Sequence, residues 1–196
     1  MTIQYKFAEL HDCGHIASWI NSIGYGHIEY LLDGLMPKRS ALEHLQRVLG
    51  EDPDYSYQNV DLAIQKNDVI GLIFSYDAHS NELKPEMIKI LSKDRVQWMR
   101  YFSENQISNS WYINTLGVDI AYRRQGIARQ LLDLAANRAL QNDFQSLSLH
   151  VYENNLAAID LYQSYGFIKE KKIDLSAHSF FSSRNLKANY LMKCEI

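Results

Sequence analysis

The sequence predicts an α/β fold in which helices flank a mixed central sheet of about seven strands. The chain has 196 residues, a length that one hydrophobic core serves well. Its composition is 46% hydrophobic and 22% charged, so enough apolar surface is available to offset chain entropy. Strand and helix patterns alternate over the second half, an order that joins strands through right-handed crossovers. We therefore expect residues 1–196 to form a single domain.

The N-terminal part is expected to open with a strand and two helices. Residues 3–10 alternate well enough for a first strand, and Asp12 is in position to cap the helix that follows. Apolar residues recur in that helix at helical spacing: Ile16, Trp19, Ile20 and Ile23. A second helix is predicted from Pro37 to Leu49, ended by Gly50. Residues 24–27, Gly-Tyr-Gly-His, are expected to form a loop between them.

A hairpin and an insertion are expected in the middle of the chain. Residues 60–64 alternate as a strand, residues 66–68 are turn formers, and residues 69–76 are a largely apolar strand. We expect the second strand to be central in the sheet. Residues 78–110 are less regular, apart from a helix predicted near 94–102, and we interpret them as an insertion over one face of the sheet.

From Trp111 the patterns become sharper and predict a strand–helix–strand–helix order followed by two closing strands. The predicted elements are a strand at 111–118, a helix from about 126 to 140, a strand at 146–151, a helix at 156–165 and strands near 167–173 and 188–196. A polar loop rich in serine joins the last two strands.

Charge and composition narrow the classes of partner. The chain has 20 basic and 23 acidic residues and a net charge of -3, which argues against affinity for nucleic-acid phosphates. Cys13 and Cys194 form no CxxC pair, so we expect neither a metal site nor a disulfide framework. The N-terminus lacks a secretory pattern, and the most apolar run, residues 69–74, is too short to span a bilayer. The expectation is a cytoplasmic protein without a metal, nucleic-acid or membrane partner.

One segment that carries chemistry is Arg123-Arg124-Gln125-Gly126-Ile127-Ala128, between a strand and a helix. The first amides of a helix lack intrahelical partners and lie at the positive end of its dipole, so they can bind a phosphate or diphosphate. Gly126 and Ala128 allow close approach, and the two arginines add forked donors. Alternatively, the segment is only a basic, solvated helix start. Neither GxxxxGK[ST] nor GxGxxG occurs, which removes the usual nucleotide-binding motifs.

A second segment runs from Asn155 to Phe167. An asparagine precedes the predicted helix as a cap, and Gly166 ends it just before a strand. Taken alone, the segment is a well-formed helix, and Tyr162 on its apolar face is equally explained as a core aromatic residue.

Together the two segments resemble the GNAT superfamily of N-acetyltransferases. The family's acetyl-CoA motif, [QR]-x-x-G-x-[GA], matches Arg123, Gly126 and Ala128, and its later pattern, N-x-x-A-x-x-x-Y-x-x-x-G-F, matches Asn155, Ala158, Tyr162, Gly166 and Phe167. The chain departs from the family at three positions: Ile120 stands where relatives often have proline, Arg124 where they often have glycine, and Ala128 where glycine is commoner. Each of these changes alters the stiffness or the clearance of the loop without removing an amide donor, so we expect the diphosphate site to survive.

The resemblance implies a splayed sheet and a direct transfer from acetyl-CoA to an amine. In the family the pantetheine arm lies beside the splayed strand like an added strand, here near Leu116 and Val118, and the diphosphate binds at residues 125–128. A backbone amide near Val118 would polarise the thioester oxygen, Tyr162 would protonate the departing thiolate, and Asn155 would orient CoA or its helix. The implied cofactor contacts are Leu116, Gly117, Val118, Arg123, Arg124, Gln125, Gly126, Ile127, Ala128, Asn155 and Tyr162.

The amine must also lose a proton, and no single base is evident from the sequence. Candidates at expected strand ends are Asp77, His79, Glu104 and His150, although a surface or structural role explains each of them better than catalysis does. Neither cysteine falls in the motifs, which disfavours an acyl-enzyme route.

The acceptor pocket is expected to combine aromatic residues from three places. These are the loop with Tyr25, His27 and Tyr30, the insertion with Trp98 and Tyr101, and the loop at residues 178–181. A small metabolite, a polyamine, an antibiotic and a protein N-terminus all stay open as the amine. The oligomeric state is open as well, a homodimer included.

Two other functions compete with the enzyme. A non-catalytic domain that binds acyl-CoA for regulation or sensing would keep the same phosphate-binding turn. A nucleic-acid module that uses Arg123, Arg124, Arg129 and Arg138 is disfavoured by the acidic net charge.

Overall fold

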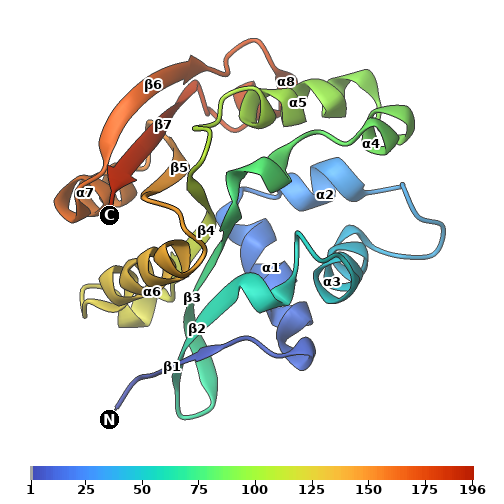
Figure 1. Ribbon diagram of the computed structural model, residues 1–196. Coiled ribbons are helices and arrows are strands. Elements are labelled where there is room, and N and C mark those ends of the chain that lie inside the picture. Colours follow the sequence, from blue (N-terminus) through green and yellow to red (C-terminus); the bar gives the residue numbers. More distant parts are fainter. Residues whose placement is uncertain (1) are drawn as a thin grey trace. The chain divides into compact units, whose positions relative to one another are not determined.

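Seven strands and eight α-helices occur in the computed structural model, which describes residues 2–196 (Figure 1). The strands are β1 (Gln4–Phe7), β2 (Val60–Gln65), β3 (Asp68–Asp77), β4 (Trp111–Val118), β5 (Ser146–Tyr152), β6 (Ile168–Asp174) and β7 (Ala188–Glu195). The helices are α1 (Cys13–Ile23), α2 (His27–Leu32), α3 (Ala41–Glu51), α4 (Pro85–Ile90), α5 (Lys93–Ser103), α6 (Ile127–Gln141), α7 (Leu156–Tyr165) and α8 (Ser179–Ser182). The α/β fold class predicted from the sequence is confirmed.

The strands form one sheet in the order β1-β2-β3-β4-β5-β7-β6. Its outer pairs, β1 with β2, β2 with β3, β5 with β7 and β6 with β7, are antiparallel. The chain also divides into two compact units, which are described separately below. Unit 1 comprises the residues up to 76 together with 113–138, and unit 2 comprises residues 77–112 and 139–196, so that β4 contributes to both.

In unit 1 the predicted hairpin of β2 and β3 is confirmed. Its connection is two residues long, and Lys66 and Asn67 both have positive φ angles, +52° and +71°, as this kind of tight hairpin requires. Helices α1 and α3 contact each other on the side of these strands away from α6 (Figure 1). Fully buried aliphatic and aromatic residues fill the space between helices and strands: Ile16, Ile20, Leu49, Leu62, Leu72 and Phe74.

Two helix predictions in unit 1 are wrong in detail. Helix α3 begins at Ala41 rather than near Pro37, because Ser40 and Glu43 form a capping box: the Glu43 amide donates to Ser40 Oγ (3.2 Å) and the Ser40 amide donates to Glu43 Oε2 (2.7 Å). The segment expected to be a loop runs into helix α2 at His27. Gly26, at φ +77°, precedes this short helix and makes no side-chain cap, so no local signal marked it.

In unit 2 the predicted strands and helices are present, with β5, β7 and β6 paired in that order. Residues 78–110, interpreted as an insertion, contain α4 and α5. The aromatic rings of α5 and α8 pack together, with the Trp98 ring stacked 6.0 Å from Phe181 and tilted 4.7 Å from Phe102. Within the described chain, no helix is long and apolar enough to cross a membrane.

Candidate active site

The predicted phosphate-binding segment in unit 1 forms an exposed turn that leads into α6. Residues 123–126 are exposed to solvent, whereas Ile127 is 2% exposed and anchors the helix in the core. Five apolar residues of this helix are buried at helical spacing: Ile127, Leu131, Leu132, Ala135 and Ala139. The helix is therefore held in the core, and its first turn, at residues 127 and 128, directly follows a solvent-exposed loop.

Two residues of this turn have left-handed backbone conformations, Arg124 at φ +63° and Gly126 at φ +81°. A Cβ at Gly126 would meet nothing within 4 Å, so glycine is required there by the backbone angle and not by space. Turns that contain left-handed residues can point successive amides to one side and make an anion-binding concavity. The turn, with Gln125 between the two residues, therefore has the local geometry expected for a phosphate site.

The loop between β4 and α6 is tied to the end of β4. The Arg123 Nε donates to the Val118 carbonyl oxygen (3.1 Å), which places this guanidinium at the strand end. The Asp119 amide donates to Ile70 on β3 (2.9 Å), and the Asp119 carboxylate accepts from the Ala121 amide (2.8 Å). The turn is thus fixed relative to the strand along which the pantetheine arm is expected.

The regular alternation of β4 breaks between Asn114 and Gly117. Gly71 on β3 faces α6, so Tyr76 faces the opposite side, and Asn114 Nδ2 donates to the Tyr76 hydroxyl there (2.9 Å). A Cβ at Gly117 would meet Ile23 of α1, on that same side. Two residues three positions apart cannot share a face of a regular strand, so β4 is irregular between Asn114 and Gly117.

In unit 2, the helix predicted from the second motif has the predicted bounds. Asn155 caps α7 by accepting from the Ala158 amide (3.3 Å), and Gly166, at φ +127°, ends it. Tyr162 is 8% exposed, and its ring lies 5.6 Å from the Phe167 ring. Burial raises the pKa of the Tyr162 hydroxyl, so the phenol stays protonated at neutral pH. The structure thus gives Asn155 a capping role and Tyr162 a packed, protonated side chain.

Three of the four candidate bases occupy surface or capping positions. The Asp77 carboxylate caps a turn by accepting from the His79 amide (2.9 Å). The His79 ring is 77% exposed beside Glu82, and the Glu104 carboxylate is 65% exposed beside Arg100. None of these three has the burial that would tune it for proton transfer.

His150 on β5 is different, because both of its ring nitrogens are buried. Burial lowers its pKa from 6.5 to about 4, and the backbone of Asn105 and the side chain of Asn189 offset this only partly. The ring lies edge-on to Phe102 (5.2 Å) and to Tyr112 (6.0 Å, between ring centroids). The imidazole is therefore neutral at pH 7, with a lone pair available. Sequence reasoning missed Tyr112 and Asn189, since neither belongs to a motif.

Four of the residues expected around the acceptor are buried: Trp98, His178, Phe180 and Phe181. In unit 2, His178 and Phe181 are 2% and 0% exposed, and the Tyr101 ring packs against both, at 5.9 and 5.5 Å. In unit 1, His27 Nδ1 bonds to the Gly24 carbonyl (3.1 Å), whereas Tyr25 is 42% exposed. Tyr25 and Ser179 are thus the exposed members of the expected set.

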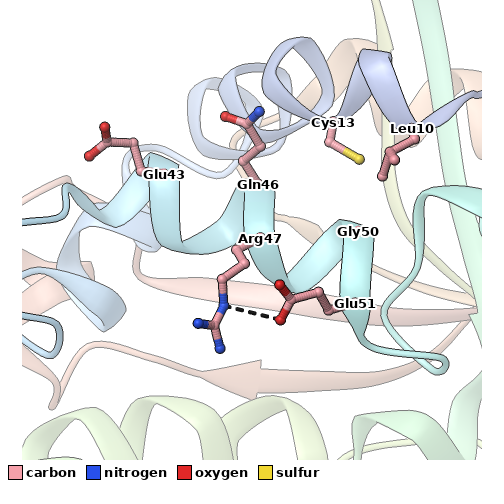
Figure 2. Close-up of a pocket in the computed structure, with 7 residues that line it drawn as sticks. All are labelled: Leu10, Cys13, Glu43, Gln46, Arg47, Gly50 and Glu51. Atoms are coloured by element: carbon pink, nitrogen blue, oxygen red, sulfur yellow. Dashed lines mark ion pairs between the residues drawn. The ribbon is translucent and has the colours of Figure 1, made fainter.

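A hollow of about 440 Å³ in unit 1 lies apart from the predicted site residues. Figure 2 shows its lining from α3, together with the residues that begin α1, and the ion pair between Arg47 and Glu51 (3.2 Å). Cys13 contributes to the lining; it and Cys194 are buried free thiols. Among residues 2–196, no group of three or more His, Cys, Asp and Glu side chains is arranged to hold a metal ion.

Comparison with known proteins identifies the class to which this fold and turn belong. The profile of the family described as "Acetyltransferase (GNAT) family" matches residues 39–167, which include β4, the turn, α6 and α7. The chain therefore belongs to the GNAT family of acetyltransferases.

Two curated relatives match over short stretches. N-alpha-acetyltransferase 30 of Saccharomyces cerevisiae is 34% identical over 62 residues, 32% of this chain and 35% of that protein. N-alpha-acetyltransferase 50 of Danio rerio is 41% identical over 73 residues, 36% of this chain and 42% of that protein. The match thus spans less than half the length of either relative.

Solved structures share the fold over almost the whole chain. An N-acetyltransferase from Staphylococcus aureus Mu50 has a TM-score of 0.67 at 22% identity and covers 97% of this chain and 99% of its own. A chain of the NatC complex bound to Gag peptide and CoA has a TM-score of 0.56 at 18% identity, with 100% and 99% covered. At these identities the likeness extends to the fold alone.

Proposed function

We propose that residues 1–196 act as one acetyl-CoA-dependent N-acetyltransferase domain that transfers the acetyl group directly to a primary amine. The observation that carries this proposal is the exposed turn with left-handed residues at Arg124 and Gly126, fixed between an irregular strand and an anchored helix. Family membership supports it, because acetyl transfer gives the family its name.

In this proposal the diphosphate of CoA binds the amides of Gln125, Gly126, Ile127 and Ala128, at the positive end of the α6 dipole. Arg124 and Arg123 supply charge-assisted donors beside them. The pantetheine arm pairs with backbone groups of Leu116, Gly117 and Val118, where the alternation of β4 is broken. Binding at these distant groups would aim the thioester at the acceptor.

The chemistry needs an acid and a base. The amine nitrogen attacks the thioester carbonyl carbon, a backbone amide near Val118 stabilises the oxyanion, and the C–S bond breaks. Tyr162 donates its proton to the departing thiolate; its phenol, whose pKa burial raises further above neutrality, carries that proton at pH 7. Asn155 supports this step through α7, whose first turn it caps.

We assign the base role to His150, because it is the buried member of the four candidates. With a pKa of about 4, it is too weak to deprotonate a free alkylammonium, whose pKa is near 10. It can, however, accept the proton once the N–C bond forms, because the nitrogen then carries positive charge and becomes far more acidic. The proton would next pass to water.

We further propose the α-amino group of a peptide as the acceptor. The two curated relatives are named N-alpha-acetyltransferases, and a chain of similar fold comes from the NatC complex bound to Gag peptide and CoA. An α-amino group has a pKa of about 8, roughly two units below that of lysine. A larger fraction of it is therefore the neutral amine at pH 7, and a weak base is enough for the reaction. We also propose a cytoplasmic location, since both buried cysteines are free thiols.

Calorimetry with CoA and acetyl-CoA, followed by an assay of thiol release, tests this function. Peptides with free N-termini should release thiol in the presence of acetyl-CoA, whereas the same peptides with blocked N-termini should not. Small amines and polyamines are the comparison set, and release with these alone would move the acceptor away from peptides. Tight CoA binding with no transfer to any amine would favour the sensor, and no CoA binding would refute both.

A further inference from the structure

Four polar side-chain atoms lie buried together in the sheet of unit 2 without hydrogen bonds of ordinary geometry. They are Nδ1 and Nε2 of His150 and Oδ1 and Nδ2 of Asn189, and none makes a hydrogen bond of ordinary geometry within residues 2–196. Asn189 is 1% exposed. Buried side-chain polar atoms are nearly always paired, so an unpaired imidazole and an unpaired amide in one place require an explanation.

The strand register puts these two side chains on the same face of the sheet. Asn189 of β7 is directly opposite Tyr152 of β5, and His150 lies two residues from Tyr152. Side chains two apart on a strand share a face, and so do cross-strand partners. Asn189 is therefore the diagonal neighbour of His150, and its amide interacts with the imidazole, although the contact is not that of a full hydrogen bond.

The other neighbours of the imidazole are mostly aromatic rings. Phe102 of α5 and Tyr112 of β4 contact the ring, and Tyr152 follows on the same face of β5. Two charged groups of unit 2 are paired elsewhere: Glu104 pairs with Arg100 at the surface, and Lys171 of β6 donates to Asn105 Oδ1 (2.6 Å). The polar groups that interact with the imidazole are the backbone of Asn105 and the side chain of Asn189, and Asn189 is the one that a substitution can remove.

We propose that Asn189 is a positioning residue for His150: its amide oxygen accepts the N–H of the imidazole and so fixes which ring nitrogen keeps a lone pair for the acceptor amine. This rests on the proposed function. A neutral imidazole has one N–H and one lone pair, and the hydrogen bond made by one nitrogen sets the role of the other. Such contacts are often long in the free enzyme and tighten when substrate binds.

The proton balance is simple. The lone-pair nitrogen of His150 takes the proton that the acceptor nitrogen loses as its bond to the acetyl carbon forms. The resulting imidazolium has two N–H groups, one of which the Asn189 oxygen accepts, and it releases the added proton to water after the product leaves.

An amide suits this role better than a carboxylate does. An aspartate at this position would raise the imidazole pKa and so favour the protonated ring, which has no lone pair for the amine. An amide orients the ring without adding charge, so the ring stays neutral until it takes the proton.

The test combines histidine NMR with kinetics of the full chain, using Asn189→Leu and Asn189→Asp. The imidazole resonances of His150 report its tautomer and its titration without CoA and without turnover. Wild type should show one tautomer, and Asn189→Leu should show a mixture, with kcat at least tenfold lower and an unchanged KM for acetyl-CoA. Asn189→Asp should raise the His150 pKa by at least one unit and move the acidic limb of the kcat/KM profile to higher pH by the same amount.

Ser148→Ala is the matched control, because Ser148 is a buried polar residue on the same strand, bonded to Ser110 (2.6 Å) and not to the imidazole. It should leave the His150 tautomer and the pH profile as in wild type. An unchanged tautomer in Asn189→Leu, or an unchanged His150 titration in Asn189→Asp, would overturn the proposal. If one of the two Asn189 variants does not fold, the NMR result of the other variant is sufficient to test the proposal. Absence of acetyl transfer by wild type would instead refute the proposed function, and the NMR result would stand separately.

Discussion

Mild acid is the perturbation that best tests the buried histidine in this protein. Burial lowers the pKa of His150 from 6.5 to about 4. The unfolded chain restores the ordinary value, so below about pH 6.5 the unfolded state binds a proton that the folded state excludes. The folded pKa is the lower one, and the stability due to neutral His150 is therefore complete above pH 6.5 and is lost as the pH falls toward 4.

The size of this loss follows from the two pKa values. Each pKa unit corresponds to about 1.4 kcal/mol, so His150 alone accounts for about 2 kcal/mol of lost unfolding free energy between pH 7 and pH 5. His27 in unit 1, whose pKa burial also lowers to about 4, adds a second loss in the same window. Because domains of this kind have about 5–15 kcal/mol of stability in total, the change is readily measurable.

Urea unfolding at pH 7 and pH 5 measures the effect. Replacing His150 by phenylalanine keeps an aromatic ring beside Phe102 and Tyr112 but removes the titration. His150→Phe should therefore lose about 2 kcal/mol less than wild type between the two pH values. His79→Gln is the control and should behave as wild type, because the His79 ring is 77% exposed. Equal losses in wild type and His150→Phe would refute the assignment of a buried, neutral imidazole.

Three further substitutions test the site and the fold. Tyr162→Phe should keep CoA affinity by calorimetry but lower turnover, since it removes the proposed proton donor; unchanged turnover at saturating substrates would exclude that role. Gly126→Val should weaken CoA binding by about tenfold or more, because a β-branched residue resists the φ of +81° at this position. Gly34→Val is the control: it strains another loop, at φ +74°, and should leave CoA affinity unchanged. Asp61→Asn should lower the unfolding free energy by about 3 kcal/mol, because it breaks a buried ion pair with Arg138 (3.0 Å); a loss below about 1 kcal/mol in urea would contradict this.

Elements that carry their own boundary signals were predictable from the sequence. The bounds of α7 were predicted correctly because Asn155 caps its start and Gly166, in a positive-φ conformation, ends it. The start of α3 was placed too early because Pro37 is a good first residue of a helix, whereas the capping box of Ser40 and Glu43 is the stronger signal. Helices α2 and α8 were missed because six and four residues are too few for a period to emerge.

The same distinction between local signals and tertiary packing holds for the candidate site. The turn before α6 could be predicted because its chemistry belongs to the backbone of six consecutive residues. The surroundings of His150 could not, because Phe102, Tyr112 and Asn189 come from three other elements and are brought to it only by strand register and helix packing. For the same reason, the sequence alone could not rank His150 above the three other candidate bases, since burial is a property of the fold.

Arg124 connects the departure from the family pattern with the proposed chemistry. At φ +63° it occupies the left-handed region, which disfavours a residue with a side chain by roughly 1–2 kcal/mol relative to a right-handed conformation. Glycine, which many relatives have there, would relieve this strain. The side chain is exposed, so core packing does not offset the strain. An anion at the first turn of α6 would offset it, because a guanidinium and helix amides stabilise the same phosphate oxygens. The proposed diphosphate would therefore account for the strain at Arg124, although a positive φ alone does not mark a site, since Lys38 and Lys66 also have one.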